Sequence, residues 1–249
     1  MSSEKKSHLD ILLSENKERE QKKLIIINNP SYKKRHVILS FHGINEIFFL
    51  HKAFSEKNIQ ASKVFLYKIA MSHSYYYEKL NGEIFNVLNI FTYAVLSDNE
   101  SLIKRIQSYN RTEHPDSFST YFNKGIQSIL KNDKISLSIN IEGLKKWRSE
   151  DWTRNYQGII TTFEGFQTND KIKIEQGLEE IVKFHDLQEQ PLIAKDYINI
   201  EATALAKLAW RKGIKVKPAS KLIPEELLPV NQLRSYENYD FFNELDGKF

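Results

Sequence analysis

The chain has 249 residues, of which 41% are hydrophobic and 27% charged, so it is long enough for one elongated domain or two small ones around a sizeable core. It has no cysteine, which excludes disulfides, thiol catalysis and Cys-ligated zinc or iron–sulfur sites. The formal net charge is +4, with the basic excess in residues 1–80 and an acidic excess in residues 222–249.

The N-terminal region is charged throughout. Residues 1–30 lack the 7–15-residue apolar stretch of a secretory signal, so we expect a variable helical segment and a protein that stays in the cytoplasm. The basic excess over residues 1–80 is interpreted as a solvated helical surface, because no Arg-rich or Gly-rich pattern of nucleic-acid binding accompanies it.

The chain from residue 31 onward predicts helices. Prolines are absent from 31–114 and 116–190, and the apolar run 84–96, too short to span a bilayer, is interrupted by Asn and Thr at helical spacing. Ser97-Asp98-Asn99-Glu100 fits a capping box, with Ser97 as the N-cap. Apolar residues recur at helical spacing in five stretches: 37–48, 118–129, 156–163, 174–185 and 198–209. The predicted fold class is therefore all-α.

A tetrapeptide recurs along these helices. Asn132-Asp133-Lys134-Ile135 returns 37 residues later as Asn169-Asp170-Lys171-Ile172, and a looser copy places Asp98 35 residues before Asp133. We expect each Asn of the exact copies to end one helix in the left-handed conformation and each Asp to cap the next. Repeats of this length are typical of stacked helical hairpins. We predict a single domain, 1–249, with tetratricopeptide-like hairpins over 84–212 and a docked tail over 213–249.

Two segments are ambiguous. Residues 135–141 alternate like a strand but also fit a helical stripe, which we favour because the matching segment after Asp170 is helical. Residues 24–27 remain open between helix and strand. Gly143 and Gly177 fall inside predicted helices, where each costs ~1 kcal/mol against Ala, so we expect a close backbone approach between packed helices there.

No pattern of a catalytic or nucleotide-binding site is present, and the seven histidines lack the i, i+4 spacing of a metal site on a helix. We expect no catalytic residues, no cofactor and no metal. Trp147 and Trp152 flank a charged turn, an arrangement typical of binding hot spots, although such rings more often pack at a helix edge. The candidate partner-binding residues, placed around the repeat turns, are Trp147, Glu150, Trp152, Glu179 and Glu180, together with the acidic tail.

The C-terminal segment carries a resemblance. A helix at 198–209 ending in Trp210-Arg211-Lys212-Gly213 is followed by Ile223-Pro224-Glu225-Glu226-Leu227-Leu228-Pro229-Val230 and by Tyr236-Glu237-Asn238-Tyr239-Asp240-Phe241-Phe242. This succession resembles the end of the bacterial immunity protein 49 family. The segment 93–98 and the Asn-Asp hairpins extend the resemblance over about residues 84–242.

The resemblance implies a helical, non-enzymatic antitoxin that binds and neutralises the secreted polymorphic toxin encoded beside it. It brings no catalytic residues, and it implies structural roles for Trp210, Gly213, Pro224, Leu227, Leu228, Tyr236 and Tyr239. A basic toxin would suit the acidic tail. The alternatives are a tetratricopeptide-like regulatory scaffold that binds peptides or proteins, and an enzyme with a site built from His185 and nearby acids. We expect no membrane partner, and nucleic acid is disfavoured.

Overall fold

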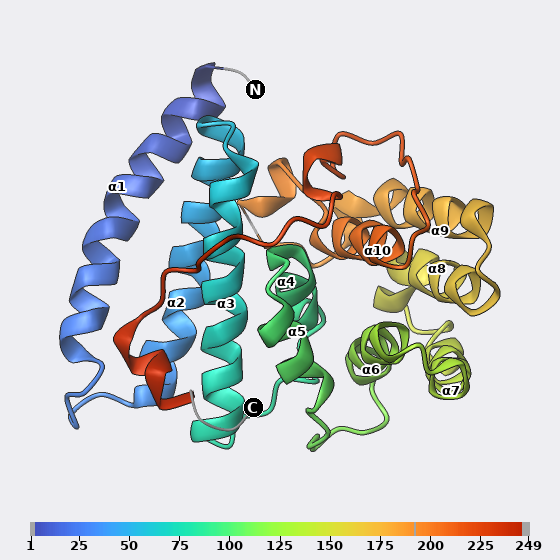
Figure 1. Ribbon diagram of the computed structural model, residues 1–249, viewed down its shortest axis with the longest axis horizontal. Helices are drawn as coiled ribbons and strands as arrows, with labels where there is room; N and C mark the ends of the chain where they lie inside the picture. The colour runs from blue at the N-terminus through green and yellow to red at the C-terminus, as the bar shows by residue number, and fades with distance from the viewer. Residues whose placement is uncertain (1–2, 192, 246–249) are drawn as a thin grey trace. The chain divides into compact units, whose positions relative to one another are not determined.

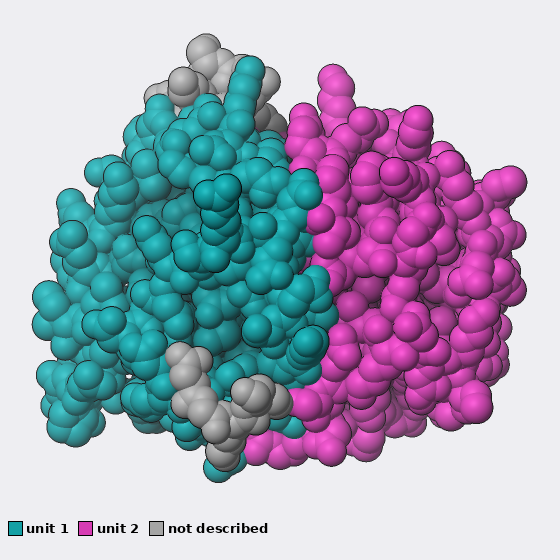
Figure 2. Space-filling model, in the orientation of Figure 1, with its two compact units in different colours: residues 1–83, 97–105, 231–249 teal, residues 84–96, 106–230 magenta. Residues whose placement is uncertain are grey.

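The computed structural model describes the backbone of residues 3–191 and 193–245, and these residues are helical without a β-strand (Figure 1). The chain forms two compact units (Figure 2). The first unit contains residues up to Glu83, Ser97–Arg105 and the segment from Asn231 onward, and the second contains Ile84–Leu96 and Ile106–Val230.

The first unit is built on three long helices, α1 (Ser3–Ile26), α2 (Lys34–Leu50) and α3 (Ile59–Lys79). A π-helical turn, His51–Ser55, continues α2. α1 packs on α2, α2 packs on α3, and a 3₁₀ segment, Asp240–Leu245, packs on α3. The apolar stripe expected over 37–48 is buried along α2, and the ambiguous residues 24–26 end α1 as helix.

The second unit holds most of α4 (Ile90–Ser97), the end of α5 (Glu100–Gln107) and α6 to α10. Consecutive helices pack on one another from α6 to α10. Their bounds are α6 Phe118–Lys131, α7 Lys134–Lys146, α8 Gln157–Thr168, α9 Lys171–Lys183 and α10 Ile200–Arg211. The helical interpretation of 135–141 is confirmed, because these residues lie within α7.

Two predicted helices are too long. The stretch 84–96 is helical only from Ile90, because its first residues form turns whose carbonyls are bonded elsewhere: Asn123 Nδ2 donates to Phe85 O at 3.1 Å and to Val87 O at 2.9 Å. The stretch 174–185 ends as α-helix at Lys183, and His185 lies in a 3₁₀ turn, His185–Leu187.

Four turns between helices share one backbone form. The first residue of each has a positive φ, between 54° and 60°, and the second caps the next helix by accepting a hydrogen bond from a backbone N–H three residues ahead, at 2.8–3.1 Å. The four pairs are Lys57-Asn58, Asp98-Asn99, Asn132-Asp133 and Asn169-Asp170. The predicted roles of Asn and Asp in the two exact copies are therefore confirmed.

The structure corrects the third copy of the repeat. Asp98 adopts the left-handed conformation, so it corresponds to Asn132 and not to Asp133. Asn99, not Ser97, caps α5, and its Oδ1 accepts from Leu102 N at 2.8 Å. Glu100 is then the first residue of α5, where it cannot complete the predicted capping box.

Gly177 allows α8 and α9 to approach at the level of the backbone. A Cβ on Gly177 would lie 2.5 Å from Thr162 N and 2.6 Å from Gly158 O. The close approach expected there is confirmed. At Gly143 the neighbour is a side chain instead, because a Cβ would lie 2.3 Å from the Tyr121 ring.

The chain after α10 begins with the predicted glycine turn. Gly213 has φ +80°, and the N–H of Ile214 donates to Ala209 O at 2.8 Å, which closes the helix end. The Lys207 ammonium is buried and donates to Leu227 O and Pro229 O at 2.5 and 3.1 Å, joining this part of the tail to α10.

Residues 231–245 pack in the first unit. Tyr236 donates its hydroxyl proton to Ser97 O at 2.7 Å, and burial raises the pKa of Tyr236 to about 12. The Tyr239 and Phe241 rings stack on each other and lie against Phe41 of α2, with centroids 4.7 and 5.3 Å from it. The aromatic residues of the tail therefore complete the core that α2 begins.

Candidate functional site

Trp147 and Trp152 lie on one surface cleft of the second unit. Trp147 caps the end of α7, and Trp152 begins a 3₁₀ turn, Trp152–Tyr156, that leads into α8. The buried Thr153 holds the loop between them, because its hydroxyl donates to Trp147 O and, at 2.9 Å, to Glu150 O. The position of both indoles is thus set by the path of the backbone.

The Trp152 ring is half in contact with the core and half in solvent. Its edge packs on Phe118 and Tyr156, with centroids 5.4 and 6.2 Å away, and 44% of the residue is exposed. Phe118 and Tyr156 are both buried. A large, rigid ring held in this way offers contact area at low entropic cost, which is the property of a binding anchor.

The loop before α6 forms the other wall of the cleft. The cleft has a volume of about 450 Å³ and is lined by Asn86, residues 113–119, Trp147 and Trp152. Thr120 donates its hydroxyl proton to His114 O at 2.8 Å, and Ser117 caps α6, so the loop is tied to the helix. We call this feature the tryptophan cleft.

Two carboxylates line the tryptophan cleft, those of Glu113 and Asp116. Asp116 accepts a hydrogen bond of 2.6 Å from the Tyr121 hydroxyl, which raises the pKa of Tyr121, and Lys146 lies 3.8 Å from the same carboxylate. The cleft thus has indole rings and carboxylates in its lining, the combination that suits a cationic side chain.

The five predicted partner-binding residues do not form one group. Glu150 is exposed in the turn between the two tryptophans but does not line the cleft. Glu179 is exposed on α9, and Glu180 accepts a hydrogen bond of 3.1 Å from Thr161 of α8. Both tryptophans lie at the helix ends opposite to the Asn-Asp turns, so the predicted placement around those turns is wrong for them.

The acidic tail is divided between the two units. Glu225 and Glu226 are exposed in the second unit. In the first unit, the Glu244 carboxylate accepts a hydrogen bond of 2.5 Å from Tyr75, which lowers the pKa of Glu244, and Glu237 lies 3.9 Å from Lys68. Asp246 lies outside the described residues. The expected acidic tail is therefore not confined to one unit.

His185 is buried, and both of its ring nitrogens have hydrogen-bond partners. Nε2 faces the carbonyl of Lys195 at 2.7 Å and must donate, so Nδ1 accepts from Asn199 Nδ2 at 2.9 Å. Gln190 Nε2 donates to the buried carboxylate of Glu201 at 2.6 Å, and burial raises the pKa of Glu201. This polar cluster is internal, and neither His185 nor Glu201 lines the tryptophan cleft.

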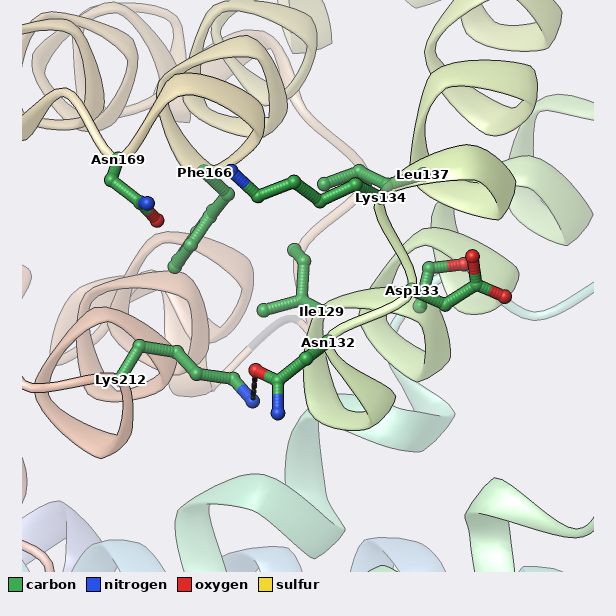
Figure 3. Close-up of a pocket in the computed structure, with 9 residues that line it drawn as sticks. Ile129, Asn132, Asp133, Lys134, Leu137, Phe166, Asn169 and Lys212 are labelled. Carbon is green, nitrogen blue, oxygen red and sulfur yellow. Dashed lines mark hydrogen bonds between the residues drawn. The ribbon is translucent and has the colours of Figure 1, made fainter.

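A second pocket lies between the two exact copies of the repeat (Figure 3). Its apolar floor is formed by Ile129, Leu137 and Phe166. The polar residues around it are Ser128, Asn132, Asp133, Lys134, Asn169 and Lys212. We call this feature the turn pocket. Sequence reasoning missed it, because Lys212 follows α10 and lies beside the turns only in the folded chain.

Within the described residues, no group of three or more His, Asp or Glu side chains could hold a metal ion. In the same part of the chain, no helix is long and apolar enough to cross a membrane. Comparison with known proteins found no match to a family model, to a curated protein or to a solved structure.

Proposed function

We propose that this protein is an immunity protein of the cytoplasm, which binds one polymorphic toxin and blocks it by stoichiometric association. The support from sequence is the C-terminal resemblance to the immunity protein 49 family. The support from structure is the tryptophan cleft, which offers rigid aromatic contact area on the surface.

The chemistry of the cleft specifies the kind of toxin surface that would enter it. Glu113 and Asp116 line the cleft with Trp147 and Trp152, so an Arg or Lys side chain could pair with a carboxylate while its cation lies over an indole face. We therefore propose that the toxin presents a basic residue here. Electrostatic attraction of a basic toxin would also raise the rate of association.

The test is co-expression and titration with the product of the adjacent toxin gene. We expect protection of cells at one-to-one stoichiometry, and loss of at least about tenfold in affinity for Trp152→Ala, which corresponds to about 1.4 kcal/mol. Tyr32→Ala is the matched control, because Tyr32 is also an aromatic residue that is half exposed, but it lies in the first unit.

Two further variants separate inhibition from catalysis. Asp116→Asn keeps an acceptor for the Tyr121 hydroxyl and removes the charge, so it should weaken binding without unfolding the loop. His185→Asn should leave protection intact wherever the variant folds. Protection by catalytic amounts of protein, or equal affinity of Trp152→Ala and wild type for the toxin, would contradict the proposal.

One observation favours a second candidate, a tetratricopeptide-like scaffold that binds peptides or proteins. Four helix–helix turns share one backbone form, which is the mark of a repeated hairpin unit. A scaffold would bind its partner without neutralising it. Binding of the adjacent gene product with no loss of its toxicity would favour this candidate over the immunity protein.

A further inference from the structure

The turn pocket combines an apolar floor with two cations that approach from different elements. Lys134 begins α7, and its side chain extends across the pocket toward Phe166 (Figure 3). Lys212 follows α10 and reaches the pocket from the other side, next to Asn132. The amide of Asn169, held by its left-handed backbone, points into the pocket from the second turn.

The one acidic residue among the lining side chains is directed elsewhere. The Asp133 carboxylate accepts hydrogen bonds from the N–H and the hydroxyl of Ser136, at 2.9 and 2.6 Å, and these bonds lower the pKa of Asp133. It points away from the pocket (Figure 3). The two lysines are therefore not neutralised by a carboxylate from within the pocket lining.

The Lys212 ammonium is partly satisfied by neutral acceptors. It donates to Asn132 Oδ1 at 2.7 Å and to Leu130 O at 3.1 Å, and an ammonium has three protons. Burial and the neighbouring charge of Arg211 lower the pKa of Lys212. A bound carboxylate would accept the remaining proton and supply the opposite charge that this cation lacks.

The size of the pocket limits the apolar part of a ligand. Its volume is about 130 Å³, and its floor is made of the aliphatic and aromatic side chains of Ile129, Leu137 and Phe166. A cavity of about this size holds one benzene-sized apolar group. One branched aliphatic side chain would therefore fill it, with its polar end at the lysines.

We propose that the turn pocket binds the free C-terminal carboxylate of a polypeptide whose last residue is aliphatic, such as leucine. The side chain would occupy the apolar floor, and the carboxylate would lie between Lys134, Lys212 and the Asn169 amide. Ile135, the residue after Lys134, is 79% exposed and offers apolar surface for the residues that precede the C-terminus. This inference is independent of toxin neutralisation, because it concerns a different cleft and holds for a scaffold as well.

The repeat supplies a matched control for this site. Lys134 and Lys171 occupy the same position in the two exact copies, but only Lys134 lines the pocket. Lys134→Ala should therefore weaken binding, whereas Lys171→Ala should not. Both side chains are exposed at the start of a helix, and the pair of Lys171 with Glu175, at 3.7 Å on the surface, contributes little to stability, so the two substitutions carry comparable consequences for folding.

The experiment is an NMR titration of the full chain with three probes: N-acetyl-leucine, its carboxamide N-acetyl-leucinamide, and the peptide acetyl-Gly-Ser-Gly-Leu with a free C-terminus. The signals followed are the methyl groups of Ile129 and Leu137 and the amide of Asn169. We expect saturable shifts of these signals with both free acids, at least about tenfold weaker binding of the carboxamide, and the tightest binding for the peptide. Lys134→Ala should weaken binding of the peptide several-fold, and Lys171→Ala should match wild type.

Several results would overturn the proposal. These are equal binding of acid and carboxamide, no saturable shift with either acid, or equal weakening by Lys134→Ala and Lys171→Ala. In a fourth titration, with hexanoate, tighter binding than that of the peptide would show that the pocket takes a free fatty acid and not a polypeptide terminus. None of these outcomes bears on protection against a toxin, so failure here is distinguishable from failure of the proposed function.

Discussion

Lys63 Nζ lies 2.8 Å from Asp98 Oδ2, and both side chains are fully buried in the first unit. The same ammonium donates to Asn231 O at 2.9 Å, and Asp98 Oδ2 also accepts from Asn231 N at 3.2 Å. This ion pair therefore joins α3, the turn before α5 and the beginning of the last segment of the chain. Such a pair is costly to break, because removing one partner leaves an uncompensated charge in the interior.

We predict that Lys63→Met lowers the free energy of unfolding by about 3–5 kcal/mol, because it leaves the Asp98 carboxylate buried without its cation. The double variant Lys63→Met, Asp98→Asn should recover most of this loss, since Asn tolerates the left-handed backbone at position 98. Urea denaturation of the three proteins measures the effect. A double variant no more stable than Lys63→Met would contradict this account.

Gly177 and Gly43 should respond oppositely to alanine. At Gly177 a Cβ would meet the backbone of α8, so we expect Gly177→Ala to lower the free energy of unfolding by about 1–3 kcal/mol. A Cβ on Gly43, inside α2, would meet nothing within 4 Å apart from its chain neighbours and the backbone of its own helix, so Gly43→Ala should raise the free energy of unfolding by up to ~1 kcal/mol. Thermal unfolding of both variants tests the contrast, and a stabilised Gly177→Ala would disprove the close approach of α8 and α9.

The turns in the two exact copies of the repeat should differ in their tolerance of glycine. Gly adopts positive φ without strain, so Asn169→Gly should change the free energy of unfolding by less than ~0.5 kcal/mol. Asn132→Gly removes an acceptor of the Lys212 ammonium, so it should lower the free energy of unfolding by about 0.5–1.5 kcal/mol more than Asn169→Gly does. Chemical denaturation of both variants measures this difference. Equal effects would mean that the bond from Lys212 to Asn132 does not contribute to stability.

Acidification should destabilise the first unit through His73. The ring is buried with its Nε2 2.8 Å from Nδ1 of His42, and burial, followed by the charge of His42, lowers the pKa of His73 well below its ordinary value. The unfolded chain then binds a proton that the folded chain does not, so stability is fully present above pH ~6.5 and falls as the pH decreases below it.

For one proton, His73 changes the free energy of unfolding by at most about 1.4 kcal/mol per pH unit. We expect His73→Gln to flatten the dependence of the free energy of unfolding on pH between 7 and 5, measured by urea denaturation at each pH. His36→Gln is the control, because His36 is exposed. An unchanged slope in His73→Gln would show that the pair does not titrate on unfolding.

Local signals in the sequence were sufficient to locate several of the helices and two of the turns. Apolar spacing located α2, α6 and α10, and the Asn-Asp pairs showed where α7 and α9 begin, because capping depends on residues close in sequence. The turn at Lys57-Asn58 has the same backbone form, but its sequence lacks the Asn-Asp pair and did not reveal it. Lysine carries no preference for positive φ, so no residue type marked that turn.

The candidate sites combine residues that are distant in sequence, so the sequence predicted them only in part. Trp147 and Trp152 were recognisable from their type and spacing, but their shared cleft needs the loop 113–119 as its second wall. The turn pocket needs Lys212, 80 residues after Asn132. Glu179 and Glu180 line neither the tryptophan cleft nor the turn pocket, and their predicted role in partner binding stays a prediction.

The division of the tail between the two units has a consequence for the order in which the protein can fold during synthesis. The second unit is complete once Val230 has been made, whereas the first unit begins with α1 and still lacks Tyr239, Phe241 and Phe242 at that moment. The helices α1 and α2 must therefore wait for residues 239–242, which are made after the whole of the second unit, before their core is filled. Folding of the first unit thus depends on a segment that is synthesised later than the second unit, whereas folding of the second unit does not.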